Sequence, residues 1–267
     1  IGSQGKEIGQ MLEPSALAFD SAENLYVADE KLNRITRFDY EGEVIDSWGA
    51  AGSEPGQFEH PTGLLIINDI VFVVDALNHR IQEYTTDGDF IGQWGDKGSC
   101  GESLKYPWGI SGAINGDIYV ADWGNDRVVR FTQGGEFVSD IHKGEGAELY
   151  LNRPADVAID QDDNMFVADW GNQVLQVFDG DGNFLDMNRG EADLNPWAVE
   201  YLEAQQDEKK ARSTYVPIYD TDTDDVREIS ARIEPFFWDP CSVTLDESGR
   251  VYVLETCRHR FQIFERR

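Results

Sequence analysis

The stretch that decides the fold is Pro61–Trp94, PTGLLIINDIVFVVDALNHRIQEYTTDGDFIGQW. It contains four short runs of residues that favour β-strands. The first two are apolar, and the second ends in Asp75; the third alternates apolar and polar residues, and the fourth ends in Trp94. Turn residues separate the runs, and Asp87-Gly88 between the last two is typical of a β-hairpin. Four short antiparallel strands in succession predict one blade of a β-propeller.

The same pattern recurs along the whole chain. Each copy opens with a proline and a short apolar strand, and the opening prolines are 42 to 47 residues apart. A regular period in this range is typical of propellers and repeat arrays. We therefore predict a single all-β domain over residues 1–267, a six-bladed β-propeller of four-stranded blades. The blades are expected to begin near residues 14, 61, 107, 154, 196 and 240, at Pro14, Pro61, Pro107, Pro154, Pro196 and Pro240.

Two parts of the chain depart from the pattern. In the unit that Pro196 opens, we place the second strand at residues 214–220, after an insertion that includes the helix candidate Val199–Arg212. The last unit ends after its third strand, so the sixth blade is expected to be incomplete. Residues 1–10 align with residues 48–57, and the strand that would complete this blade is therefore expected upstream of Ile1.

Two short motifs carry a resemblance to a known family. Asn78-His79-Arg80-Ile81 and the linker Gly56-Gln57-Phe58, together with the proline, the acid-terminated strand and the closing Trp-Gly, resemble the NHL repeat. The resemblance implies a six-bladed propeller. It also implies that the residues after each proline and after each acid surround the mouth of the central channel.

Net charge excludes several classes of partner. The chain has 51 acidic and 22 basic residues, which gives a net charge of −29. Such a field repels phosphate backbones and anionic lipid. RNA binding, which some NHL domains show, needs a basic face. We expect a protein partner or a small ligand, no nucleic acid and no insertion into a membrane. The oligomeric state is not indicated.

Tryptophans gather at one end of the expected ring. Strands within a blade alternate in direction, so the residue after each proline lies beside the residues that follow each acid. An aromatic arc there suits a ligand held by stacking or cation–π contact. The alternative is that the indoles pack blade against blade. The candidate ligand-binding residues are Trp108, Trp123, Trp170, Trp197 and Trp238.

The acids that end the second strands recur in five units. An acid at this position accepts hydrogen bonds from the N–H groups of the next loop and pairs with an arginine a few residues on, at Arg34, Arg80 or Arg127. A catalytic group is needed only once, so the recurrence favours a structural role. The expected structural acids are Asp29, Asp75, Asp122, Asp169 and Glu255.

Signals for metals and cofactors are weak. Asp220, Asp222 and Asp224 alternate as calcium ligands do, but the glycine and the distal glutamate of an EF-hand loop are missing. Zinc requires clustered histidines or cysteines, and the four histidines fall in different contexts. We expect no metal site and no cofactor, with calcium as the alternative.

The cysteines favour an exported protein. Cys241 begins a strand and Cys257 follows the end of the adjacent one, so we predict a disulfide between them. Cys100 is expected to be a free thiol. One disulfide in a chain with few cysteines favours an extracellular, periplasmic or otherwise exported location.

These observations favour a recognition or scaffolding module over an enzyme, and no catalytic residue is assigned. The alternative is a lyase- or hydrolase-type enzyme that uses carboxylates of the channel. Propeller lyases that resemble this architecture, the peptidyl-hydroxyglycine lyases, bind metal through histidines just after the blade prolines. No histidine stands at the corresponding positions here, which are Ser15, Thr62, Trp108, Ala155, Trp197 and Cys241.

Overall fold

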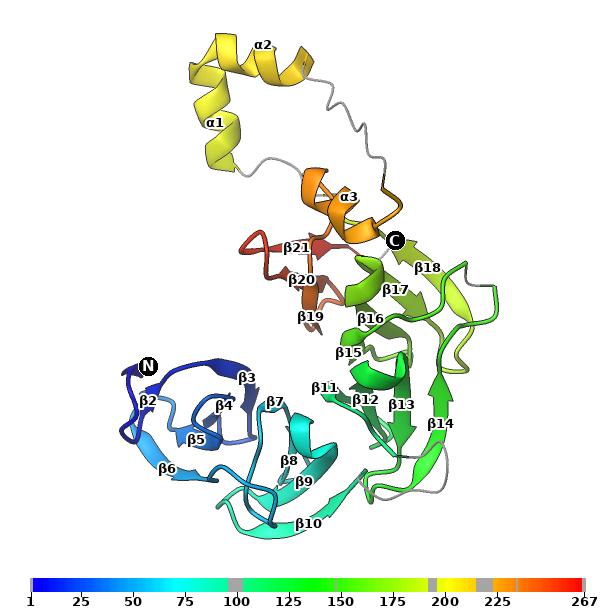
Figure 1. Cartoon of the computed structure of the whole chain (residues 1–267). Coiled ribbons are helices and arrows are strands. Elements are labelled where there is room, and N and C mark those ends of the chain that lie inside the picture. Colours follow the sequence, from blue (N-terminus) through cyan, green and yellow to red (C-terminus); the bar gives the residue numbers. More distant parts are fainter. Residues whose placement is uncertain are drawn as a thin grey trace.

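The computed structural model describes residues 2–95, 103–146, 148–191, 196–214, 223–233 and 235–265. Its strands form five antiparallel blades that follow one another around an arc (Figure 1). Blade 1 contains β3 (Pro14–Phe19), β4 (Leu25–Asp29), β5 (Arg34–Phe38) and β6 (Val44–Trp48). Blade 2 contains β7 (Pro61–Ile67), β8 (Ile70–Asp75), β9 (Arg80–Thr85) and β10 (Phe90–Trp94).

Blades 3 to 5 repeat this order. Blade 3 contains β11 (Pro107–Gly112), β12 (Ile118–Asp122), β13 (Arg127–Phe131) and β14 (Phe137–Ile141). Blade 4 contains β15 (Pro154–Ile159), β16 (Met165–Asp169), β17 (Val174–Phe178) and β18 (Phe184–Asn188). Blade 5 contains β19 (Pro240–Leu245), β20 (Val251–Glu255) and β21 (Arg260–Phe264). A short parallel pair, β1 (Ser3–Gln4) and β2 (Gln10–Met11), precedes blade 1.

The apolar core lies between neighbouring blades. Strand alternation gives each blade two apolar faces, and neighbouring blades pack face to face in the row β3, β7, β11, β15, β19. One linker side chain, three residues before each blade proline, completes every cluster. These side chains are Met11, Phe58, Leu104, Leu151 and Phe237.

A repeated hydrogen bond also links consecutive blades. The residue before the blade proline adopts a left-handed conformation, with φ of 53° at Arg153 and 49° at Tyr106. Its N–H donates to a side chain in the preceding blade, as from Arg153 N to Asp126 Oδ1 at 2.8 Å and from Tyr106 N to His79 Nδ1 at 3.0 Å. In blades 2 to 5 the residue before the proline is therefore fixed at the end of the blade where the second strand finishes.

The number of blades corrects the sequence prediction. Strands begin at five of the six prolines, but Pro196 begins helix α1 (Pro196–Ala204), and the described chain forms five blades rather than six. Proline is well tolerated in the first turn of a helix, and the residues that follow Pro196 include many strong helix formers. The helix expected at Val199–Arg212 is present as α1 and α2 (Gln206–Thr214).

The insertion contributes a third helix, α3 (Val226–Arg232), before blade 5. Asp225 caps its N-terminus by accepting hydrogen bonds from the N–H groups of Arg227 and Glu228. The strand expected over residues 214–220 falls largely on residues outside the described part of the chain. In Figure 1, α1 and α2 project away from the blades, whereas α3 lies against blades 4 and 5. None of the helices described is long and apolar enough to cross a membrane.

Candidate functional site

Three tryptophans form a continuous row across blades 3 and 4. Trp108 follows the first residue of β11, and Trp123 begins the 3₁₀ turn after β12, called η2 (Trp123–Asn125). Trp170 begins the equivalent turn of blade 4, η3 (Trp170–Asn172). The ring centroids of Trp108 and Trp123 are 6.4 Å apart, and those of Trp123 and Trp170 are 6.3 Å apart. We call Trp108, Trp123 and Trp170 the tryptophan row.

Pairing within the blade explains why these rings meet. Pro107 lies opposite Asp122, so the residues that follow each of them lie at the same end of the blade. The same antiparallel register in blade 4 pairs Pro154 with Asp169 and places Trp170 next to Trp123. Trp108 is 41% exposed, and the other two are half-buried. The row therefore presents partly exposed indole rings at the end of the propeller.

Two arginines lie over the row. The guanidinium carbon of Arg153 is 4.9 Å from the ring centroid of Trp123 and 6.0 Å from that of Trp170. Arg227 of α3 lies 5.5 Å from the Trp170 centroid. It donates to both carboxylate oxygens of Asp239, from Nε at 2.8 Å and from Nη2 at 2.5 Å. The distances from the two guanidinium groups to the tryptophan rings are within the range of cation–π interactions.

The arginines change the chemistry that this face offers. A free aromatic arc favours a cationic ligand, but guanidinium groups already lie over Trp123 and Trp170. Arg153 is itself exposed and carries a positive charge on a strongly acidic protein. The face therefore suits a group that combines an apolar surface with a carboxylate or another hydrogen-bond acceptor.

Sequence reasoning missed both arginines. Arg227 belongs to α3, far along the chain from blade 4, and no spacing rule connects it with Trp170. Arg153 had a usable signal, because it precedes a blade proline as His60 and Tyr106 do, and the repeated hydrogen bond fixes that position.

The other two candidate tryptophans are not part of the row. Trp197 belongs to α1, and its side chain is outside the described part of the structure. Trp238 precedes blade 5, is half-buried, and has the guanidinium carbon of Arg258 5.6 Å from its ring centroid. The structure thus brings together three of the five candidates.

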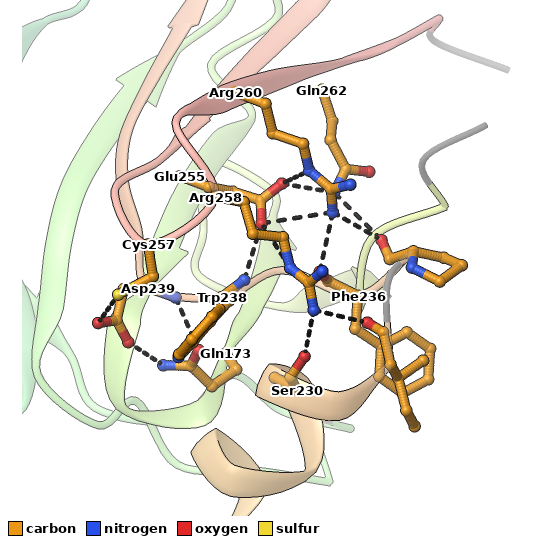
Figure 2. A network of polar contacts seen from close by, with 12 residues as sticks. Gln173, Ser230, Phe236, Trp238, Asp239, Glu255, Cys257, Arg258, Arg260 and Gln262 are labelled. Atoms are coloured by element: carbon orange, nitrogen blue, oxygen red, sulfur yellow. Dashed lines mark hydrogen bonds and ion pairs between the residues drawn. The ribbon is translucent and has the colours of Figure 1, made fainter. Parts of the chain in front are cut away.

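A polar network fastens α3 and the linker to blade 5 (Figure 2). Glu255 accepts hydrogen bonds from the backbone N–H of Trp238 at 2.8 Å, from Arg260 Nε at 2.6 Å and from Gln262 Nε2 at 2.8 Å. Arg258 donates to the carbonyl oxygen of Ser230 in α3 at 2.6 Å. This network holds α3 in place, and α3 in turn carries Arg227 to the tryptophan row.

The predicted disulfide is wrong, because Cys241 and Cys257 are both free. A β-bulge lies between Pro240 and Ser242, at Cys241, and Cys257 lies beyond the end of β20. Each thiol donates to its own acceptor, Cys241 to the carbonyl oxygen of Leu254 at 3.6 Å and Cys257 to Asp239 Oδ2 at 3.1 Å. Burial raises the pKa of the Cys241 thiol to about 11, so it is protonated at neutral pH. Cys100 lies outside the described residues.

The recurring acids hold the linkers between blades. Asp75 accepts from the backbone N–H of Glu59 at 2.7 Å and pairs with Arg80 Nε at 2.8 Å. Asp122 accepts from the N–H of Lys105 and pairs with Arg127, both at 2.7 Å. In blade 1, Asp29 accepts from the N–H of Leu12 at 2.7 Å, while Arg34 donates to backbone carbonyls instead.

Asp169 differs because Val174 stands where blades 2 and 3 have an arginine. The carboxylate accepts hydrogen bonds from the neutral amides of Asn172 at 2.7 Å and Gln176 at 2.6 Å. Burial raises the pKa of Asp169 to about 6, and these hydrogen bonds offset only part of the effect.

Asp156 is a further carboxylate, on the innermost strand β15, that the sequence did not single out. Its Oδ2 accepts hydrogen bonds from Ser242 Oγ at 2.8 Å and from the N–H of Val243 at 3.0 Å, both in blade 5. Asp156 is half-buried, and desolvation by the surrounding protein raises its pKa to about 6. Asp156 therefore joins two blades and titrates close to neutral pH.

This raised pKa predicts a specific pH dependence. The folded protein holds a proton on Asp156 below about pH 6, whereas the unfolded chain holds it only below about 3.8. The contribution of Asp156 to stability should therefore rise by ~2–3 kcal/mol as pH falls from 7 to 4. Urea unfolding of the wild type and of Asp156→Asn, measured at both pH values, tests this prediction. The change should appear in the difference between their free energies of unfolding, because the other carboxylates are common to both proteins and contribute equally. Parallel pH profiles for the two proteins would contradict it.

Metal ligands do not gather among the described residues, where no group of three or more His, Cys, Asp or Glu side chains could hold an ion. Asp220 and Asp222, two of the acids that suggested calcium, lie outside the described part of the chain.

The family resemblance is confirmed at two positions. The NHL repeat model matches residues 151–178 and 237–264, which cover the first three strands of blade 4 and the three strands of blade 5. No curated protein matches the sequence. Several solved structures share the propeller fold at low sequence identity.

Three of these structures illustrate the range of proteins that share the fold. Virginiamycin B lyase from Staphylococcus aureus is 14% identical, with a TM-score of 0.57 over 95% of this chain and 70% of that chain. A gluconolactonase from Xanthomonas campestris is 13% identical, with a TM-score of 0.55 over 91% and 69%. A nidogen/laminin complex contains a chain that is 15% identical, with a TM-score of 0.56 over 95% and 80%. At these identities the likeness shows the fold alone.

Proposed function

Because the chain is a β-propeller with NHL repeats, we propose that it is a recognition module that binds a protein partner through the tryptophan row and Arg153. The observation that carries the proposal is the contact between the three rings, with Arg153 over two of them. Tryptophan and arginine are enriched among the residues that contribute most to protein interfaces. Clustered exposed aromatic surface also marks contact sites on soluble proteins.

The chemistry of the face defines the partner. Trp108 is the most exposed of the three indoles and would serve as the apolar anchor. Arg153 would pair with a carboxylate of the partner beside that anchor. The partner's contact segment should therefore present an apolar side chain next to Asp or Glu. An exported location stays a prediction, and the free thiols of Cys241 and Cys257 remove the argument that rested on a disulfide.

Affinity capture tests this proposal. Wild-type protein and Trp108→Ala are immobilised and exposed to an extract of the source organism, and bound proteins are quantified by mass spectrometry. We expect a partner that the wild type retains and that Trp108→Ala reduces at least tenfold. Tyr40→Ala is the matched control, because Tyr40 is a 76% exposed aromatic residue of blade 1. Equal capture by all three proteins would refute a binding role for the row.

The competing proposal is a lyase- or hydrolase-type enzyme, and one observation favours it. Asp156 has a pKa of about 6 and lies on an innermost strand, as a general acid or base would. Its hydrogen bonds to Ser242 and Val243 account for the same residue as a link between blades. Turnover of a substrate that Asp156→Asn abolishes without loss of stability would favour the enzyme.

A further inference from the structure

Blade 4 keeps the buried acceptors that surround the acid of blade 2 but has fewer donors. In blade 2, Arg80 donates from Nε to Asp75 at 2.8 Å. The Tyr84 hydroxyl donates to Gln82 Oε1 at 3.0 Å. An apolar residue replaces each of these two donors in blade 4, which has the same strand register. The corresponding residues of blades 2 and 4 are Asp75 and Asp169, Arg80 and Val174, Gln82 and Gln176, and Tyr84 and Phe178.

The side-chain amide of Gln176 is only half paired. Gln176 is fully buried, and its Nε2 donates to Asp169 Oδ2 at 2.6 Å. Its Oε1 accepts a hydrogen bond from none of the residues that the structure describes. The equivalent amides of two other blades are paired at both atoms, since Gln82 Oε1 and Gln262 Oε1 each accept from a backbone N–H at 2.9 Å. A buried oxygen without a donor is costly, so Gln176 Oε1 favours a partner from outside the chain.

Asp169 lies beside this amide without a positive charge to balance it. The carboxylate is fully buried. In the described part of the chain it accepts hydrogen bonds from neutral groups, among them the amides of Asn172 and Gln176 and the backbone N–H of Asn152. In blades 2, 3 and 5 an arginine side chain pairs with the equivalent acid at 2.6 to 2.8 Å. A buried carboxylate is costly unless a positive charge compensates for its lost hydration, so this position favours a cation.

The linker before blade 4 adds a third oxygen. In blade 2, Arg80 Nη2 donates to the carbonyl oxygen of Gln57, four residues before the blade proline, at 3.0 Å. Tyr150 has the same position in blade 4. Its carbonyl oxygen and Asp169 Oδ2 both accept from Asn172 Nδ2, at 2.6 and 2.7 Å. Two oxygens that share one donor nitrogen lie close enough together to contact the same ion.

We propose that blade 4 binds a small monovalent cation, Na⁺ or K⁺, where blades 2 and 3 have an arginine guanidinium. The ligands from the chain would be a carboxylate oxygen of Asp169, Gln176 Oε1 and the carbonyl oxygen of Tyr150. Carboxylate, amide and carbonyl oxygens suit hard cations, whereas zinc requires nitrogen or sulfur ligands. A single carboxylate balances one positive charge. This ligand set differs from a cluster of three or more His, Cys, Asp or Glu side chains, which the described residues do not form.

The charge and the position of the site give it a wider effect. The net charge of −29 concentrates small cations around the protein. Asp169 directly precedes Trp170, so the ion would also fix the start of η3. The site does not depend on the proposed recognition role, because its ligands are buried in blade 4 and none of them belongs to the tryptophan row.

Thermal unfolding in different salts tests the site. The full chain is unfolded in NaCl, in KCl and in tetramethylammonium chloride at the same ionic strength, because tetramethylammonium is too large to replace a bound Na⁺ or K⁺. We expect a melting temperature at least about 3 °C higher in NaCl or KCl, since a ligand that binds only the folded state stabilises it. Equal melting temperatures in the three salts would overturn the proposal in favour of a water molecule beside Gln176.

Two matched variants assign the effect to blade 4. Asp169→Asn keeps the shape of the side chain but removes its charge, and it should abolish the difference between the salts. Asp122→Asn is the same change at the acid of blade 3, which pairs with Arg127, and it should retain the difference. A difference that Asp169→Asn retains would place the bound cation elsewhere and refute the site.

A third variant replaces the proposed ion with a side chain. Val174→Arg supplies a guanidinium from within blade 4, at the position that Arg80 and Arg127 have in blades 2 and 3. We expect the melting temperature of Val174→Arg to be the same in all three salts. A Val174→Arg protein that still prefers Na⁺ or K⁺ by the wild-type margin would show that the cation and the arginine do not share a site, against the proposal.

Discussion

Asp75→Ala is expected to lower the free energy of unfolding by about 3–5 kcal/mol. Asp75 is fully buried and accepts hydrogen bonds from Arg80 at 2.8 Å, from Gln82 at 3.0 Å and from the backbone N–H of Glu59 at 2.7 Å. Alanine leaves the Arg80 guanidinium, which is also buried, without its carboxylate. It also removes the acceptor that fixes the linker before blade 2. Chemical denaturation followed by circular dichroism measures the change.

A control in the same blade distinguishes this mechanism from a general effect of lost charge. Asp89 is exposed in the hairpin before β10, so Asp89→Ala removes one negative charge without opening a buried network. We expect Asp89→Ala to change stability by less than about 0.5 kcal/mol. If Asp75→Ala has an effect as small as that of Asp89→Ala, the recurring acids do not hold the blades together.

Gly109→Ala is expected to destabilise the protein by about 3 kcal/mol. A Cβ at Gly109 would lie 2.0 Å from Asp156 Oδ1 and 2.7 Å from Asp156 Cα, so the strands β11 and β15 would have to separate. The shift would also disturb the hydrogen bonds from Asp156 to Ser242 and Val243. One methyl group would thus weaken contacts among three blades.

Thermal and chemical unfolding of Gly109→Ala measure this cost. Gly134→Ala in blade 3 is the matched control, since its Cβ would have Thr132 Oγ1 at 3.9 Å as its nearest neighbour. We expect near wild-type stability for the control. A Gly109→Ala protein as stable as Gly134→Ala would show that the inner strands tolerate separation and that Asp156 does not lock them.

Much of the blade was predictable from the sequence because its geometry is local. Proline, apolar alternation and an acid-terminated strand define one antiparallel sheet, and antiparallel pairing then places Trp108 beside Trp123. Both steps depend on residues within a few tens of positions of one another. The row across blades 3 and 4 follows from repetition of the same geometry.

The number of blades was harder to predict from the sequence. Pro196 has the spacing of a blade proline, but a proline also begins helices, and the residues after it favour α1 and α2 over strands. The spacing of prolines therefore overcounts blades wherever an insertion begins with one. The disulfide failed for a related reason, since a bulge at one residue changes the direction of Cys241 without leaving a signal in the sequence.

The positions of Arg153 and Arg227 over the tryptophan row depend on tertiary structure. Arg227 reaches Trp170 only because Asp239 accepts its guanidinium and because Arg258 ties α3 to blade 5. These residues come from an insertion and a linker whose pattern does not repeat. Sequence patterns located the aromatic part of the face, and the structure supplied its charged part.

The most direct test of the recognition role is the affinity of Trp123→Ala for the captured partner, measured by calorimetry beside its melting temperature. Trp123 contacts both other members of the row and Arg153. We predict a loss of about 2 kcal/mol in binding, roughly thirtyfold, with a melting temperature within a few degrees of the wild type. Unchanged affinity together with a large drop in melting temperature would contradict the account and assign the row to blade packing.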